Sequence, residues 1–150
     1  MTGNPFQNAL KAIHDVYTES EYGINDLYRI KDIIHSLDEK QWASKEWLAE
    51  EFIKVAGEEQ GRLFIAGGWY GLLGHILSQH FSRPESYIRS VDIDPMAEVY
   101  GDKIWQGREF DFVTDDAFEN PDMDAFAWIT TSGEHVEDWE LRRWIEKKPS

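Results

Sequence analysis

The chain has 150 residues, of which 41% are hydrophobic and 14% aromatic, and it contains no cysteine. This composition suits one folded domain and excludes a disordered chain, a disulfide framework and thiolate chemistry. Acidic residues outnumber basic ones by 29 to 15, a formal charge of −14, so we expect a small molecule or a protein as partner, and neither nucleic acid nor a membrane surface.

The first 60 residues carry three helical patterns and no recognisable chemistry. Asn4 and Pro5 predict a helix start, and apolar residues then follow at three- and four-residue spacing. A second helix is predicted over about 25–36, and Ser44 is predicted to cap a third. We interpret residues 1–60 as a helical layer or lid over the rest of the chain.

From Arg62 onward, short apolar runs that predict strands alternate with helical patterns. This alternation indicates a parallel sheet with right-handed crossovers. We therefore predict a three-layer, Rossmann-like α/β core of about four strands over residues 61–150. The predicted elements are strand 63–66, helix 69–80, strand 87–92, helix 96–105, strand 110–114, strand 125–130 and helix 136–147.

The residues that suggest chemistry begin where the first of these strands ends. Gly67, Gly68 and Gly71 would let a ligand approach bare backbone N–H groups at the start of a helix. Asp92 ends the next strand about 25 residues later, close to the ~20-residue spacing of an acid that binds ribose hydroxyls. The alternative is that the glycines only allow a tight turn and close helix packing. Asp94 is predicted to cap the following helix.

Three segments, AGGWYG, VDIDP and VTDDAF, resemble the first three motifs of class I S-adenosylmethionine-dependent methyltransferases. The resemblance implies that the glycine loop runs under the methionine part of the cofactor. It also implies that the acid ending the second strand binds the ribose and that the acid after the third strand reaches the adenine. These roles would fall on Gly67, Gly68 and Gly71, on Asp92, and on Asp115 or Asp116.

The segment Thr131-Ser132-Gly133-Glu134-His135 is similar to one found after the fourth strand in small phage-encoded members of that class, although Gly133 stands where they usually have Cys. The fold usually places substrate-handling residues there, so Ser132 is predicted to help bind the cofactor. Glu134 or His135 is the predicted catalytic base. The alternative is an ordinary helix start with Ser132 as its N-cap.

Trp69 and Tyr70 lie within the glycine turn, and an aromatic face there would attract a sulfonium. We expect Tyr70 to face the ligand and Trp69 to face the core. The acidic run over residues 109–124 shows no metal-ligand spacing, and no two histidines lie at i, i+4. No metal site is predicted.

The resemblance implies a protein that binds S-adenosylmethionine and transfers its methyl group to a small molecule or a protein. Two alternatives stay open: an enzyme that cleaves S-adenosylmethionine, and a non-catalytic binding or partner protein. Without a signal peptide or an apolar run of about 20 residues, we expect a cytoplasmic protein, in the host cytoplasm if it is phage-encoded.

The family's sheet has seven strands, whereas this sequence ends after the fourth strand and a helix. We expect either a form shortened at the C-terminus or one that something else completes. In the strand order 3-2-1-4, the apolar strand 125–130 would lie at an edge of the sheet. An open apolar edge invites pairing, so we predict that the N-terminal helices or a second subunit cover it.

Overall fold

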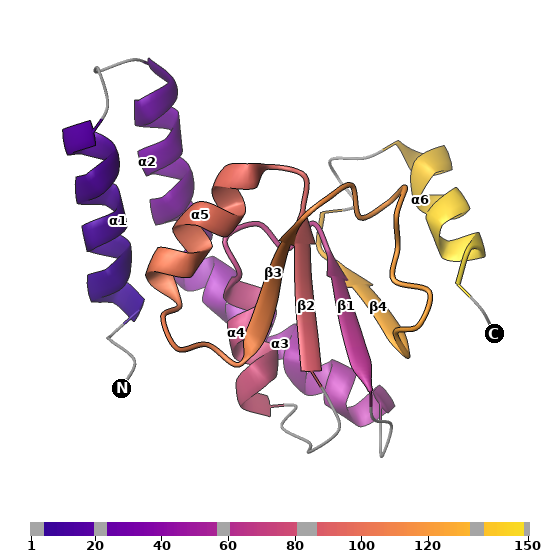
Figure 1. Ribbon diagram of the computed structural model, residues 1–150. Helices are drawn as coiled ribbons and strands as arrows, with labels where there is room; N and C mark the ends of the chain where they lie inside the picture. Colours follow the sequence, from indigo (N-terminus) through magenta and orange to yellow (C-terminus); the bar gives the residue numbers. More distant parts are fainter. Residues whose placement is uncertain (1–4, 20–23, 57–60, 81–86, 133–136, 149–150) are drawn as a thin grey trace.

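The computed structural model describes residues 5–19, 24–56, 61–80, 87–132 and 137–148, which form one sheet flanked by helices (Figure 1). Within these ranges, no helix combines the length and apolar character that crossing a bilayer requires. The elements in chain order are α1 (Pro5–Glu19), α2 (Ile24–Ser36), α3 (Glu39–Ala56), β1 (Arg62–Ala66), α4 (Leu72–His80), β2 (Tyr87–Asp92), α5 (Pro95–Ile104), β3 (Phe110–Thr114), β4 (Ala127–Thr130) and α6 (Asp138–Glu146).

The four strands are all parallel and lie in the order β3-β2-β1-β4. This confirms the predicted Rossmann-like sheet and its strand order. The register pairs Ala66 with Val91 on one side and with Thr130 on the other, and it pairs Asp92 with Thr114. The carboxyl ends of all four strands therefore meet at one edge of the sheet, where open α/β sheets bind ligands.

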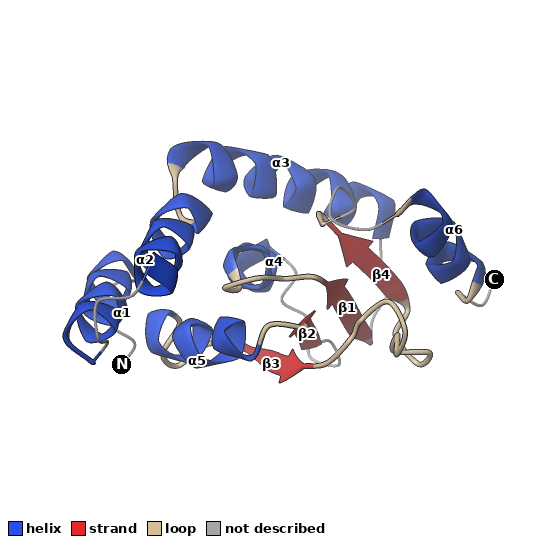
Figure 2. Ribbon diagram, turned by 90° about the horizontal axis from the view of Figure 1, so that it is seen from above, coloured by secondary structure: helices blue, strands red, loops and turns tan. Residues whose placement is uncertain are grey.

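Helices α1 to α5 lie on one side of the sheet and α6 lies on the other, beside β4, and core residues lie on both faces (Figure 2). Leu63 and Ile65 of β1 pack in a core with residues of α1 to α5, whereas Phe64 and Ala66 pack on the opposite face with Trp144 of α6. Successive side chains of a strand point to opposite faces, which explains why this buried strand is a continuous apolar run.

The third helix begins earlier than expected. It starts at Glu39, so Ser44 lies inside α3 and the prediction that Ser44 caps this helix is wrong. The Asp38 carboxylate instead accepts the backbone N–H of Gln41 at 2.8 Å, as a residue before a helix does. Asp and Ser are both good caps, and the turn after α2 decides which one the chain uses.

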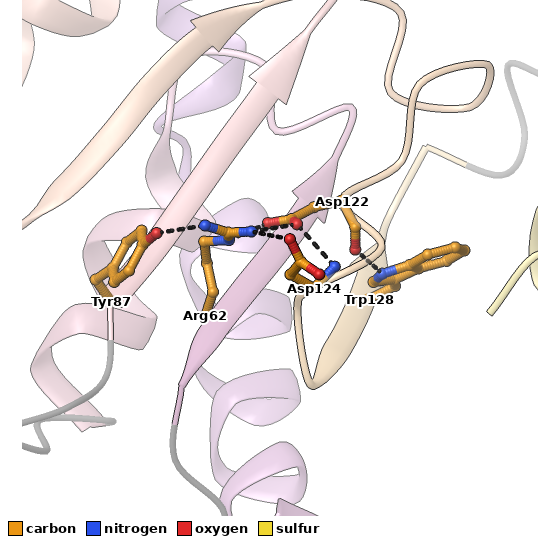
Figure 3. A network of polar contacts seen from close by, with 5 residues as sticks. All are labelled: Arg62, Tyr87, Asp122, Asp124 and Trp128. Carbon is orange, nitrogen blue, oxygen red and sulfur yellow. Dashed lines mark hydrogen bonds and ion pairs between the residues drawn. The ribbon is translucent and has the colours of Figure 1, made fainter. Parts of the chain in front are cut away.

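The amino ends of β1 and β2 are fixed by a polar network around Arg62 (Figure 3). The guanidinium donates to both carboxylate oxygens of Asp122 and to the Tyr87 hydroxyl, and it also lies 3.5 Å from Asp124. The Trp128 indole N–H donates to the backbone oxygen of Asp122 at 2.8 Å. These contacts hold the long β3–β4 connection against the sheet, at the end away from the ligand edge.

The fourth strand begins at Ala127, later than expected, and no strand in the described part of the chain pairs with its outer edge. All four of its residues keep part of their surface exposed. Phe52 of α3 lies 6.3 Å from Phe126, ring centre to ring centre, so α3 reaches the beginning of this strand. Coverage of the outer edge by a second subunit stays a prediction.

Candidate functional site

The turn after β1 is held against the end of β2. The backbone N–H groups of Gly67 and Gly68 donate to the Val91 oxygen at 2.8 and 3.1 Å, so the prediction that these two glycines offer bare N–H groups to a ligand is wrong. Gly71 has a φ of +96°, and a Cβ atom there would lie 2.3 Å from the ring of Phe112. Gly71 is therefore needed for close packing against β3, and it does not line the pocket described below.

Trp69 has an unusual backbone for a bulky residue, with φ at 52°. Such a left-handed conformation costs energy and persists only where the surroundings impose it. Here the Trp69 N–H donates to Asp92 Oδ2 at 2.9 Å. The strained turn therefore aims a backbone donor at the acid that ends β2, and it couples the two loops of the site.

The Asp92 carboxylate is half-buried and accepts two backbone N–H groups, from Trp69 and, on Oδ1 at 3.0 Å, from Asp94. A carboxylate has about four acceptor positions, so Asp92 can accept further donors from the pocket. Asp94 accepts the Met96 N–H at 3.0 Å, with Pro95 at the first position of α5. The prediction that Asp94 caps this helix is confirmed.

Arg29 of α2 connects the N-terminal helices to both loops. Its Nη1 donates to Asp94 Oδ2 at 2.7 Å and to the Tyr70 hydroxyl at 2.8 Å. Burial alone would lower the pKa of Arg29, but these two hydrogen bonds outweigh it and raise the pKa, so the guanidinium stays charged. The turn after β1 and the cap of α5 are thus fixed to one side chain of α2.

A pocket of about 740 Å³ lies over this edge of the sheet. Volumes of 300–1,000 Å³ are typical of sites for small molecules and cofactors. Residues from α2, α3, α6 and the carboxyl ends of all four strands contribute to its walls. They are Asp32, His35, Ser36, Gln41, Lys45, Gly67, Gly68, Trp69, Tyr70, Leu72, Leu73, Asp92, Ile93, Asp94, Asp116, Ala117, Phe118, Thr131, Ser132 and Glu140.

Six of the predicted cofactor-binding residues meet in this pocket: Gly67, Gly68, Tyr70, Asp92, Asp116 and Ser132. Of the two alternative acids after β3, Asp116 lines the pocket, and its Oδ1 also accepts the N–H groups of Phe118 and Glu119 at 3.1 Å. Asp115 is exposed and accepts the Asp116 N–H and the Asn120 side chain.

The two aromatic residues of the turn are exposed in the opposite sense from the prediction. Tyr70 has no exposed surface and belongs to the core, whereas Trp69 keeps part of its surface exposed. Their ring centres lie 5.3 Å apart. Burial raises the pKa of Tyr70 to about 12, although the Arg29 charge opposes this, so Tyr70 is a neutral hydroxyl. Tyr70 turns inward because its hydroxyl finds a charged donor there.

Ser132 also has a role that the N-cap alternative did not foresee. α6 begins at Asp138 and Glu137 is its N-cap, so the interpretation of Ser132 as the cap is wrong. The Ser132 hydroxyl instead donates to the Gly67 oxygen at 2.8 Å and closes the end of β4 against the glycine turn. Glu134 and His135, the predicted catalytic residues, lie outside the described residues.

Metal binding finds no support among the described residues, where no three His, Asp or Glu side chains converge. His75 stacks on Trp105 with ring centres 4.3 Å apart and lies edge-on to Trp42. Burial lowers the pKa of His75, although Glu46 opposes this. His75 is thus a packing residue.

No local pattern in the sequence indicates the residues that α2 and α3 add to the site. Arg29 and Asp32 lie in an amphipathic helix whose charges look like an ordinary solvated face. The contact of Arg29 with Tyr70 joins positions 41 residues apart, and such pairs have no local pattern. A bulky residue inside a glycine turn, here Trp69, was the one local hint of strain.

Neither a comparison with protein-family models nor a comparison with curated protein sequences gives a match. Solved structures do resemble this chain. A TehB-like SAM-dependent methyltransferase from Corynebacterium glutamicum is 13% identical, with a TM-score of 0.53 over 82% of this chain and 62% of that one. The plantazolicin methyltransferase BpumL, in complex with a plantazolicin analogue and SAH, is 11% identical, with a TM-score of 0.60 over 97% and 56%.

A third similar structure is MtNAS in complex with S-adenosylmethionine, which is 15% identical, with a TM-score of 0.54 over 93% of this chain and 49% of that one. This chain therefore spans about half to two-thirds of the length of these proteins. At such low identities the likeness shows the fold: a parallel sheet in the order 3-2-1-4 between helices, as in methyltransferases.

Proposed function

We propose that this chain binds S-adenosylmethionine at the carboxyl ends of its four strands and transfers the methyl group to a small molecule or a protein. The observation that carries the proposal is Asp92. Its carboxylate ends β2, is fixed by two backbone N–H groups, and lines a pocket of about 740 Å³ with spare acceptor capacity. This is the arrangement that two adjacent ribose hydroxyls require.

The other walls of the pocket fit the rest of the cofactor. Ala117 and Phe118 supply an apolar surface for a flat base, beside the Asp116 carboxylate as an acceptor for its amino group. Gly67 and Gly68 line the pocket without a side chain, which leaves room beside the turn for the methionine part. When bound, S-adenosylmethionine supplies a methyl group that positively charged sulfur activates, and the acidic walls favour that charge.

Positioning is the main task of the protein in such a transfer. Arg29 and Asp92 fix the two loops that would hold the nucleoside, and Ser132 fixes the end of β4 beside them. Glu134 or His135 remains our proposal for the group that accepts the proton of the methyl acceptor. Their place in the chain, two and three residues after Ser132, is the support for this assignment.

The likeness to solved structures supports the cofactor rather than the acceptor. BpumL carries SAH and MtNAS carries S-adenosylmethionine in their crystals, and both share this fold. Their acceptors are no guide at 11% and 15% identity. The substrate proposed below is argued from the residues of this chain alone.

Titration calorimetry with S-adenosylmethionine and with its product S-adenosylhomocysteine (SAH) tests the cofactor. We expect one site per chain and a loss of about tenfold or more for Asp92→Asn, since a hydrogen bond to a charged group is worth about 1.5–3 kcal/mol. Asp115→Asn removes the same charge outside the pocket and should bind like the parent. Absence of binding in a folded parent protein would exclude the proposal.

Product analysis then separates transfer from cleavage. Release of methylthioadenosine without an acceptor would identify a cleaving enzyme. Formation of SAH only when an acceptor is present would identify a methyltransferase.

A further inference from the structure

One carboxylate of the pocket has no role in the proposed cofactor site. Asp32 of α2 is half-buried and lines the pocket, yet it has no hydrogen-bond or ion-pair partner among the described residues. Arg29, one turn earlier on the same helix, is fully engaged with Asp94 and Tyr70. The Asp32 carboxylate therefore keeps acceptor positions on the pocket side that a donor or a cation of a ligand can use.

The position of Asp32 relative to the glycine turn follows from Arg29, one helical turn earlier. Residues three apart on a helix share a face, and Arg29 Nη1 donates to the Tyr70 hydroxyl at 2.8 Å. The Trp69 ring lies 5.3 Å from the Tyr70 ring, centre to centre, and Trp69 is partly exposed. Asp32 and Trp69 therefore both line the part of the pocket beside the turn between β1 and α4.

The described walls of the pocket are strongly acidic. The Lys45 ammonium is the one lysine or arginine charge among them, and it donates to the Gln41 side chain at 3.0 Å. His35 is paired with Asp38 at 2.9 Å. The carboxylates that line the same pocket are Asp32, Asp92, Asp94, Asp116 and Glu140. Repulsion in such a pocket disfavours an anionic acceptor and favours a cationic one.

We infer that the methyl acceptor is an amine, whose ammonium group binds between Asp32 and the exposed part of Trp69. This inference rests on the function proposed above, because the amine would lie in the same pocket as the cofactor. A carboxylate and an aromatic surface together form a favourable site for an ammonium group, through an ion pair and a cation–π contact. α2 and α3 would thus supply the substrate-binding wall, and the strand ends would supply the cofactor-binding wall.

The transfer balances as follows. The bound ammonium first loses one proton, to water or to the base proposed above, which frees the nitrogen lone pair while the Asp32 carboxylate stays ionised. That pair forms the new N–CH₃ bond while the S–CH₃ bond breaks, and the bonding electrons stay on sulfur. Sulfur becomes neutral and the nitrogen becomes positive again, so the product is a methylated ammonium ion and a thioether. Asp32 holds the positively charged nitrogen before and after the step.

Binding of probe amines, without turnover, tests this inference. Putrescine is the cationic probe and 1,4-butanediol is its uncharged match of similar length. Indole N–H signals in NMR spectra report binding, with the Trp69 signal assigned from Trp69→Phe. We expect putrescine to bind at least tenfold more tightly than the diol and to shift the Trp69 signal. Asp32→Asn should weaken putrescine binding about twofold to fivefold, as for a partly exposed ion pair.

The control is Glu50→Gln, which removes the same charge from an exposed position on α3. Equal effects of the two substitutions, or equal binding of putrescine and the diol, would overturn the inference. SAH and methylthioadenosine are titrated into the same proteins. If Asp32→Asn weakened SAH, left methylthioadenosine unchanged and did not affect putrescine, Asp32 would hold the amino-acid end of the cofactor instead, and the amine assignment would be wrong. If the parent bound putrescine but not SAH, the proposed function would fail separately.

Discussion

Arg29 provides the sharpest test of how the N-terminal helices support the site. Arg29→Met keeps the aliphatic stem and removes the hydrogen bonds to Asp94, at 2.7 Å, and to the Tyr70 hydroxyl, at 2.8 Å. The Arg29 and Asp94 side chains are 23% and 35% exposed, so solvent screening limits that ion pair to about 1 kcal/mol or less. The Tyr70 hydroxyl is fully buried and would lose its partner, which costs about 1–2 kcal/mol.

The expected loss in the free energy of unfolding is therefore about 2 kcal/mol. Urea denaturation followed by tryptophan fluorescence and by circular dichroism measures it, with coincident transitions as the check on two-state behaviour. Lys31→Met is the matched control, because it removes the same charge from an exposed position on the same helix. It should change stability by less than about 0.5 kcal/mol.

A second substitution separates the two hydrogen bonds. Tyr70→Phe removes the buried hydroxyl, which has no partner in the Arg29→Met background. In that background, Tyr70→Phe should therefore lower the free energy of unfolding by about 1 kcal/mol less than it does in the parent. If Arg29→Met were as stable as Lys31→Met, or if the two substitutions were simply additive, the assigned role of Arg29 would be refuted.

Three further predictions concern the turn, a histidine and the amino-end network. Gly68→Ala should destabilise the chain by about 1–3 kcal/mol, because a Cβ at Gly68 would lie 1.9 Å from Ser90 Oγ. Adding Ser90→Ala should recover part of this stability, and the denaturant midpoints of the single and double variants measure both effects. Because burial lowers the pKa of His75, the unfolded chain takes up the proton first. Stability should thus fall as pH falls below about 6.5, and His75→Phe should flatten that slope in unfolding curves from pH 8 to 5. Burial would raise the pKa of Asp122, but hydrogen bonds from Arg62 and a backbone N–H lower it, so its contribution is present above about pH 3.8 and is lost on further acidification. Asp122→Asn should cost about 1.5–3 kcal/mol at pH 7, and acid titration should narrow the difference from the parent below pH 3.8.

The fold could be predicted from the sequence to a large extent, because its signals are local. The buried strands are short apolar runs, and Asp94-Pro95 is a strong helix start at the position where α5 begins. The predicted start of a helix differs from the observed one where two residues could serve as its N-cap, as Asp38 and Ser44 could for α3. The structure uses Asp38, whose carboxylate accepts the Gln41 N–H.

The site was predictable on its strand side and not on its helical side. Asp92 and Asp116 follow strands, and parallel topology alone brings strand ends together. Arg29 and Asp32 reach the pocket only because α2 packs beside the glycine turn, a tertiary contact with no sequence pattern. Tyr70 turned inward for the same reason, since its hydrogen-bond partner comes from α2.

Hydrogen–deuterium exchange with and without SAH tests the central claim most directly, because it locates binding within the chain. The account predicts slower exchange in residues 67–73 and 92–96, where the strand ends and the glycine turn form the pocket. It predicts no change around Arg62, at the opposite end of the sheet. Slower exchange confined to the Arg62 end of the sheet would contradict this account. So would unchanged exchange throughout the chain at an SAH concentration high enough to saturate a methyltransferase.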